Sequence, residues 1–416
     1  MSKKIDERIP QHVGKGVFPE YSAVHTPWDK LISFKETVHF GARQGAVVSA
    51  AILQALRIMI PDYEERAQLM CEVAYARIGG SFRYWNQMDP GGPMRTYNIH
   101  PFCTGAAWGG LTGDVGDDYL LMCGRCNDAG TYRVEKELDV CDWDICGSEL
   151  CRTTTMSLQG ISDYLATTQR KGPSMDYAMV EAKGCGDRHC RIVAESREKF
   201  PMPEHKLWES FGPIATADQI RETPEEDTMP EPFLFMEEAN YMYQTGTNIH
   251  SKPEAATAYR GTTAATYYIL PAIDGAIQRG IVSRETAMHI LRCVMEAAGK
   301  AAWGNIVAKK ALRDWLGVPG ENPEDGRIMG GYLEVFLQTW GIDYTIEAFN
   351  KDEVVYSFHR SQFSDYVSVK HLDCLIPYWY GETKTLVNAQ WSLWEEKDEN
   401  PDICRIKIAK KIDKFC

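Results

Sequence analysis

Two distant segments of the chain match each other, and this internal repeat constrains the fold more than any other feature of the sequence. The segment AMVEAKGCGDRHCRIVAESR aligns with SLWEEKDENPDICRIKIAKK, so that Cys190 falls on Cys404 within a shared Cys-Arg-Ile. Both segments alternate apolar and polar residues around a turn, a pattern typical of a β-hairpin. Upstream, the strand-like YRVEKELDVCDW aligns with EVVYSFHRSQF and places Cys141 opposite Ser361. Helical patterns precede both blocks, so the sequence predicts an internal duplication.

The predicted fold class is α+β, with two related repeats that each consist of a helical pair followed by a curved antiparallel sheet. A chain of 416 residues exceeds the usual size of one hydrophobic core, which favours two domains. We expect an N-terminal arm at 1–35, where prolines separate short pieces, and a first α+β repeat at 36–200. An acidic, proline-rich linker follows at 201–260. The second repeat, degenerate in its cysteines, occupies 261–416. In this repeat, Ser283 with Glu285 and Thr286 nearby predicts the start of a helix. In the first repeat, Gly186-Asp187 predicts the turn of a hairpin.

Small residues mark the first predicted helices. The run GARQGAVVSAAILQALRIMI has helical periodicity, and YEERAQLMCEVAYARIGGSFRYW repeats it after Pro61. Gly41, Gly45, Ala46 and Ala50 remove side-chain bulk and would let another helix approach closely. These faces predict either the core of a domain or a contact between subunits, and we expect a homo-oligomer.

Charge and hydropathy narrow the class of partner. The formal net charge is -13, so the chain has no basic excess to neutralise phosphates, and we expect no binding to nucleic acid. It has no apolar run of about 18 residues and no apolar segment near its start, so we expect no membrane partner and a cytoplasmic location. The thirteen cysteines are then expected to be thiols, metal ligands or core residues rather than a framework of disulfides. A small-molecule substrate is the expected partner.

The stretch from Val140 to Val193 is the candidate site, because it holds five of the thirteen cysteines. If three thiolates and one carboxylate or histidine meet there, zinc could hold the fold together or activate water. The cations that are local in sequence, Arg152, Arg188, His189 and Arg191, could instead stabilise a reactive thiolate. The acids nearest in sequence for general base work are Glu149 and Asp144. The candidate metal ligands are Cys141, Cys146, Cys151, Cys185 and Cys190.

A family resemblance rests on the same residues. Helices that lead to a strand ending in Cys141, further cysteines, a helix, and a hairpin with G-x-x-x-C-R-[IV] resemble the L-2-amino-thiazoline-4-carboxylic acid hydrolase-like family and the related 4-vinyl reductase-like small-molecule-binding domains. The resemblance covers about 60 residues in each half. Cys141, Cys151 and Cys190 match best by position, followed by Cys146 and Cys185.

This resemblance implies an α+β domain with a pocket between sheet and helices and assembly through the N-terminal helices. For the hydrolase-like members it implies attack of water on a cyclic C=N or amide carbon. For the vinyl-reductase-like domains it implies ligand binding beside a zinc site. The extra cysteines, the duplication and the acidic linker are departures from both patterns.

Two functions therefore remain open. The first is a hydrolase, or another ring-opening or ring-modifying enzyme, that acts on a small cyclic compound, either an N/S-heterocycle or an aromatic derivative, with Cys141, Cys190 and Glu149 as candidate catalytic residues. The second is a non-catalytic small-molecule-binding or sensing protein with a structural metal. An open metal position or an unusually reactive thiol would favour the enzyme, and a closed site of four thiolates would favour the binding protein.

Overall fold

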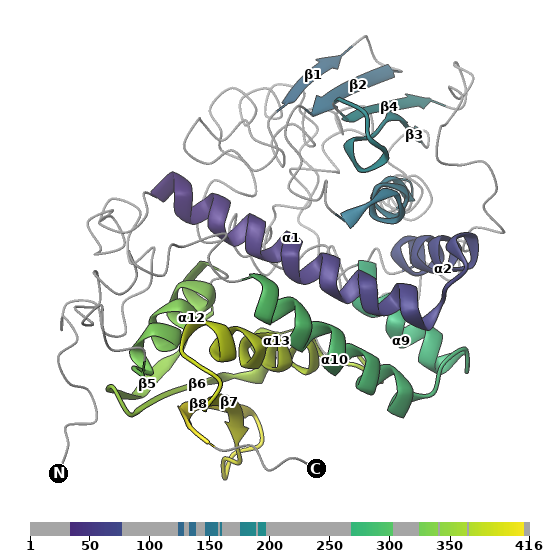
Figure 1. Cartoon of the computed structure of the whole chain (residues 1–416). Helices are drawn as coiled ribbons and strands as arrows, with labels where there is room; N and C mark the ends of the chain where they lie inside the picture. Colours follow the sequence, from purple (N-terminus) through teal and green to yellow (C-terminus); the bar gives the residue numbers. More distant parts are fainter. Residues whose placement is uncertain are drawn as a thin grey trace. The chain divides into compact units, whose positions relative to one another are not determined.

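The chain contains two compact units, which are shown in the computed structural model (Figure 1) and are described separately. The structure describes residues 34–76, 124–128, 133–138, 146–156, 159, 175–188, 190–196, 268–302, 324–339, 342–363 and 366–411. One unit, the C-terminal unit, comprises Met1–Met59, Thr257–Thr266 and Ile277–Cys416. The other, the cysteine unit, comprises Ile60–Ala256 and Tyr267–Ala276.

A four-stranded antiparallel sheet forms one layer of the C-terminal unit. Its strands are β5 (Thr345–Phe349), β6 (Glu353–His359), β7 (Trp391–Glu396) and β8 (Ile403–Lys410), in the order β5-β6-β8-β7. In β8 every second side chain is buried, because alternate residues of a strand point to opposite faces of a sheet. The sheet thus has an inner face that contributes to the core and an outer face that carries charged side chains.

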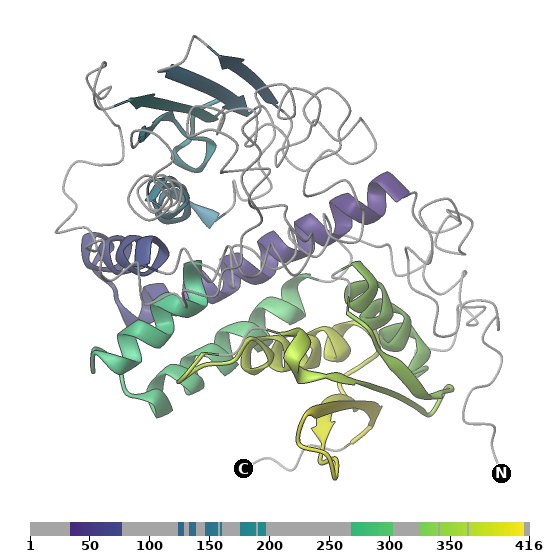
Figure 2. The ribbon, with the colours of Figure 1, turned by 180° about the vertical axis from the view of Figure 1, so that it is seen from behind.

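Helices cover the inner face of this sheet. Helices α12 (Arg327–Thr339) and α13 (His371–Leu386) contact the strands, α10 (Arg284–Ala302) packs along α13, and α1 (Phe34–Met59) contacts all three helices. Figure 2 shows α10 and α13 side by side. Ser283 accepts a hydrogen bond from the backbone N–H of Thr286 at 3.1 Å and caps α10, as its sequence predicts. The core is rich in aromatic side chains, among them Phe336 and Trp379, whose ring centroids are 5.3 Å apart.

Two glycines allow α10 and α13 to touch through their backbones. A Cβ atom added to Gly381 would overlap the carbonyl oxygen of Glu296, and one added to Gly299 would overlap that of Tyr378. We therefore expect Gly381→Ala to lower the free energy of unfolding by about 3 kcal/mol, since backbone atoms cannot give way as a flexible side chain can. Chemical denaturation measures this loss.

The matched control is Gly275 of α9 (Leu270–Gln278), another helical glycine. Its added Cβ would lie 3.5 Å from Val73 Cγ2, an ordinary contact. Gly275→Ala should therefore be neutral or stabilising by up to about 1 kcal/mol, because alanine favours a helix over glycine. Equal losses from both substitutions would contradict the close helix contact.

Acid should destabilise the C-terminal unit through His371, the first residue of α13. Burial of its ring lowers the pKa of His371 to about 3 from an ordinary value of 6.5. The unfolded chain therefore binds a proton that the folded chain excludes, and stability falls as the pH falls from 6.5 towards 3. The expected loss is a few kcal/mol, since one pKa unit corresponds to about 1.4 kcal/mol. His371→Phe should flatten this pH dependence of the denaturation midpoint, and an unchanged slope would refute the assignment.

The cysteine unit contains a second four-stranded antiparallel sheet. Its strands are β1 (Gly124–Asp128), β2 (Arg133–Leu138), β3 (Met175–Glu181) and β4 (Cys190–Ser196), in the order β1-β2-β4-β3. This order corresponds strand by strand to that of the other sheet. A helical segment at 148–156 lies between β2 and β3 in sequence, as α13 lies between β6 and β7. Helix α2 (Tyr63–Ala76) belongs to the same unit.

The structure confirms the α+β class, with helices and antiparallel sheets in both units. The hairpin β3–β4 turns at Gly186, whose φ of 93° is one that glycine adopts easily, as expected from Gly-Asp at this point. Helix α1 lies in the expected range 36–200 for most of its length, but its contacts place it in the unit of the C-terminal sheet. The start of α9 lies in the expected range 261–416, but its contacts place it in the unit of α2. The arm at 1–35 and the linker at 201–260 lie almost wholly outside the described residues. Within the described part, no helix is long and apolar enough to cross a membrane.

Candidate functional site

Two short segments of the cysteine unit have the same sequence pattern, Cys-Gly followed by three residues and another cysteine. The first is CGSELC from Cys146 to Cys151, and the second is CGDRHC from Cys185 to Cys190. In both segments the glycine after the first cysteine has a left-handed backbone, with φ of 87° at Gly147 and 93° at Gly186. Gly186 thus lies in the turn between β3 and β4, and Gly147 directly precedes the helical segment at 148–156, so each glycine joins a cysteine to a change of backbone direction or structure.

The four thiols of these segments meet around Cys151. Burial first, and then the neighbouring sulfur atoms of Cys190, Cys185 and Cys146, together raise the pKa of the Cys151 thiol to about 12. A backbone hydrogen bond with Gly184 acts in the opposite direction. The sulfur atom of Cys190 accepts a hydrogen bond from the backbone N–H of Lys183 at 3.3 Å. Cys146, Cys185 and Cys190 therefore lie near Cys151, whereas the predicted approach of Cys141 to Cys151 and Cys190 stays a prediction.

Gly184 permits the two segments to approach. A Cβ atom at this position would lie 2.7 Å from the sulfur of Cys151 and 3.0 Å from the carbonyl oxygen of Gly147. Because one of these neighbours is a backbone atom, any larger residue would push the segments apart. The turn itself is held by Asp187, whose carboxylate accepts a hydrogen bond from the backbone N–H of Ala182 at 2.8 Å.

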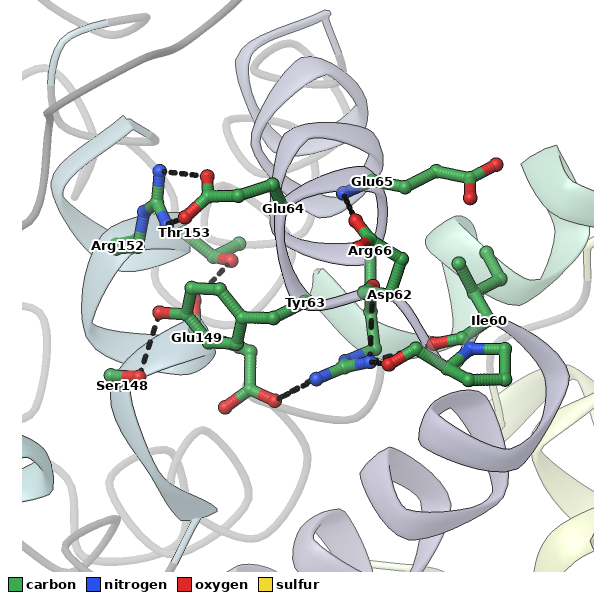
Figure 3. Close-up of polar contacts among 11 residues, drawn as sticks. Ile60, Asp62, Tyr63, Glu64, Glu65, Arg66, Ser148, Glu149, Arg152 and Thr153 are labelled. Carbon is green, nitrogen blue, oxygen red and sulfur yellow. Dashed lines mark hydrogen bonds and ion pairs between the residues drawn. The ribbon is translucent and has the colours of Figure 1, made fainter.

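A buried ion pair fixes the first segment to α2 (Figure 3). The guanidinium of Arg66 donates to Glu149 Oε1 from Nε at 3.2 Å and from Nη2 at 2.9 Å. Both side chains are almost fully buried, at 6% and 4% exposure. A further nitrogen of Arg66 donates to the backbone carbonyls of Ile60, Pro61 and Asp62, which close the turn before α2. One arginine therefore joins that turn to the helix that begins between Cys146 and Cys151.

A second set of contacts repeats this attachment one turn along the helix. Arg152 donates to both carboxylate oxygens of Glu64, at 3.2 and 3.1 Å, and the hydroxyl groups of Tyr63 and Ser148 are 2.7 Å apart. The ring of Tyr63 makes cation–π contacts with the guanidinium groups of both arginines. The Cζ atoms of Arg66 and Arg152 are 5.6 and 5.4 Å from the centroid of this ring. Figure 3 shows the aromatic ring between the two helices.

The remaining predicted residues have these positions. Cys141, Asp144 and His189 lie outside the described residues. Of the local cations, Arg152 pairs with Glu64, and Arg191 pairs with Glu181 at 2.9 Å. Glu149, predicted as a general base, is bonded to Arg66. The sequence did not identify Arg66 and Tyr63 as site residues. Arg66 lies on a helix of mixed polarity, and no local pattern indicated that it binds Glu149, 83 residues away.

The four thiols form a suitable donor set for a soft metal ion, but they are not yet arranged around one point. Among the described residues, no three His, Cys, Asp or Glu side chains are already placed to hold one ion. None of the described cysteines, these four included, forms a disulfide. Sharing one ion would therefore require the four sulfur atoms to move towards a common point.

The C-terminal unit has cysteines at two corresponding positions. Cys190 pairs with Leu138 across β2 and β4, and Cys404 pairs with Phe358 across β6 and β8. The fourth residue of the helix is Cys151 in one unit and Cys374 in the other. Both Cys374 and Cys404 are fully buried. Cys146 and Cys185 correspond to no cysteine in the C-terminal unit.

Comparison of the chain with protein-family models, with curated proteins and with solved structures finds no match.

Proposed function

We propose that the chain is a small-molecule-binding or sensing protein whose cysteine unit is held together by a structural metal ion, with Cys146, Cys151, Cys185 and Cys190 as the ligands. The observation that carries this proposal is the meeting of four thiols from two Cys-Gly-x-x-x-Cys segments around Cys151. The binding role rests on the resemblance to the 4-vinyl reductase-like domains. Zinc is the proposed metal, because four thiolates are a usual ligand set of structural zinc sites.

The pairing of ligands supports a structural role. Cys146 and Cys151 flank the start of the helix 148–156, whereas Cys185 and Cys190 flank the turn of the β3–β4 hairpin. An ion bound by all four would connect a helix to a hairpin of the four-stranded sheet that the structure describes in this unit. With four protein ligands, such an ion would have no open position for a substrate.

The geometry gives the alternative hydrolase less support. A general base needs a carboxylate that can reach substrate, whereas Glu149 is buried and accepts two hydrogen bonds from Arg66. Among the four thiols, Cys151 is unsuited as a nucleophile, because burial and the neighbouring sulfur atoms raise its pKa, whereas a nucleophilic cysteine needs a lowered one. Of the candidate catalytic cysteines, Cys141 lies outside the described residues. Both features favour a structural centre over a catalytic one.

We further infer that the two units are copies of one ancestral domain, of which only the first kept a full ligand set. The equal strand orders, the equal registers at Cys190 and Cys404, and the matching helix positions of Cys151 and Cys374 support this inference. A Glu–Arg pair across the hairpin also recurs, as Glu181 with Arg191 and as Glu396 with Arg405. The remaining pair of cysteines, Cys374 and Cys404, then fills the core.

This relation supplies a matched pair of variants. We expect a strong chelator to lower the thermal midpoint of the wild-type protein and of Cys404→Ser, because both keep four ligands. Without chelator, Cys190→Ser should have a lower thermal midpoint than the wild type, which corresponds to a loss of at least about 3 kcal/mol in the free energy of unfolding. Its midpoint should not change when the chelator is added. Wild-type protein whose midpoint ignores the chelator, or equal chelator responses from both variants, would contradict the proposal.

A further inference from the structure

A hollow on the outer face of the C-terminal sheet has the composition of a ligand site. It has a volume of ≈ 470 Å³, within the range of about 300–1,000 Å³ that is usual for small-molecule pockets. All of its residues belong to the C-terminal unit, so it is independent of the thiols. Its lining consists of Asn350, Asp352, Glu353, Trp394, Lys407, Ala409, Lys410 and Lys411.

The register of the sheet explains why a hollow forms here. Glu353 and Ser392 are the neighbours of Ala409 on either side, and Lys407 and Trp394 are paired on the next row of the same face. Ala409 has only a methyl group, so the middle strand leaves space between taller side chains. The indole of Trp394 therefore forms one side of the hollow, and the short side chain of Ala409 forms its base.

The charges around this hollow fall into two groups. Lys407 is held by Glu353 and Glu396, and Lys410 is held by Glu324. Lys411 and Asp352 differ, because neither forms an ion pair with a described residue. The ammonium of Lys411 lies over the Trp394 ring, 4.6 Å from its centroid. Judged from the described residues alone, the hollow thus offers one uncommitted cation, one uncommitted anion and one aromatic surface.

We propose that this hollow binds a zwitterionic small molecule with a planar group, of which an aromatic amino acid is the simplest example. Its carboxylate would pair with Lys411, its ammonium with Asp352, and its ring would pack on Trp394. A ligand with a single charge would leave either Lys411 or Asp352 without a partner in the bound state, which costs affinity because the ligand displaces water from both groups. The neighbouring Lys407 and Lys410 are already neutralised, so they do not bias the site towards anions.

Calorimetric titration of the full-length protein tests this proposal with three probes: L-phenylalanine, 3-phenylpropanoate, which lacks the ammonium, and phenethylamine, which lacks the carboxylate. We expect saturable binding of L-phenylalanine and affinities at least about 10-fold weaker for the other two, the equivalent of one lost charged contact. Lys411→Met, Asp352→Asn and Trp394→Leu should each weaken L-phenylalanine binding by a similar factor.

The matched control is Lys384→Met, since Lys384 also lies over an aromatic ring, 4.7 Å from the centroid of Tyr380, but does not line the hollow. It should bind L-phenylalanine as the wild type does. Denaturation midpoints of all four variants establish that each is folded. A modest ligand binds with a dissociation constant of about 1 mM. The proposal would therefore be overturned if L-phenylalanine did not saturate the protein at about 10 mM. Equal binding of 3-phenylpropanoate, or an unaltered affinity in Lys411→Met, would also overturn it, whereas either result would leave the metal site untouched.

Discussion

Replacement of Glu149 by leucine should cost about 3–5 kcal/mol of stability, because it leaves the buried guanidinium of Arg66 without a counter-charge. Arg66 is 6% exposed, and its contacts to Glu149 are the only charged ones it makes among the described residues. Its other bonds, to the carbonyls of Ile60, Pro61 and Asp62, do not neutralise it. Equilibrium denaturation in urea, followed by circular dichroism, measures the loss.

Two further variants separate the lost ion pair from the lost side chain. The double variant Arg66→Met with Glu149→Leu should be more stable than Glu149→Leu alone, because it removes the buried charge together with its partner. Glu65→Gln, on an exposed residue of the same helix turn, should change stability by less than about 0.5 kcal/mol. A Glu149→Leu variant as stable as Glu65→Gln would show that the pair does not hold the helix to α2.

The sequence predicted the elements whose signal is local. Ser283 marked the start of α10, and Gly186-Asp187 marked the turn between β3 and β4, because capping and turn formation depend on a few neighbouring residues. The alignment of Cys190 with Cys404 agrees with their positions in the two sheets, because strand alternation preserves register. The thiols of Cys146, Cys151, Cys185 and Cys190 were also singled out by their spacing.

Features that depend on distant contacts could not be predicted in this way. The bond between Arg66 and Glu149 joins residues 83 positions apart, and no local pattern marks either residue as a partner. The glycines at 299 and 381 resemble ordinary helix interruptions until α10 and α13 are placed together. The hollow beside Trp394 depends on the register of three strands. The small side chain of Ala409 leaves space only because larger residues of the two adjacent strands lie on either side of it. The placement of Cys141 stays a prediction.

Metal content should differ sharply between two groups of cysteine variants, and this is the second large effect that we expect. Loss of any one of four ligands removes a quarter of the donor set and, at a structural zinc site, commonly lowers affinity by orders of magnitude. Cys146→Ser, Cys151→Ser, Cys185→Ser and Cys190→Ser should therefore each lose the ion. Cys71→Ser and Cys374→Ser should keep it, because these buried cysteines belong to neither Cys-Gly segment.

Native mass spectrometry of full-length protein, purified without oxygen and without added chelator, tests the central proposal most directly. We expect a mass that exceeds the sequence mass by one zinc ion per chain in the wild type, Cys71→Ser and Cys374→Ser. The four ligand variants should show the sequence mass alone, without zinc. A wild-type protein that binds no metal even after incubation with zinc, or one whose zinc survives substitution of Cys151 and Cys190, would contradict the four-thiolate site.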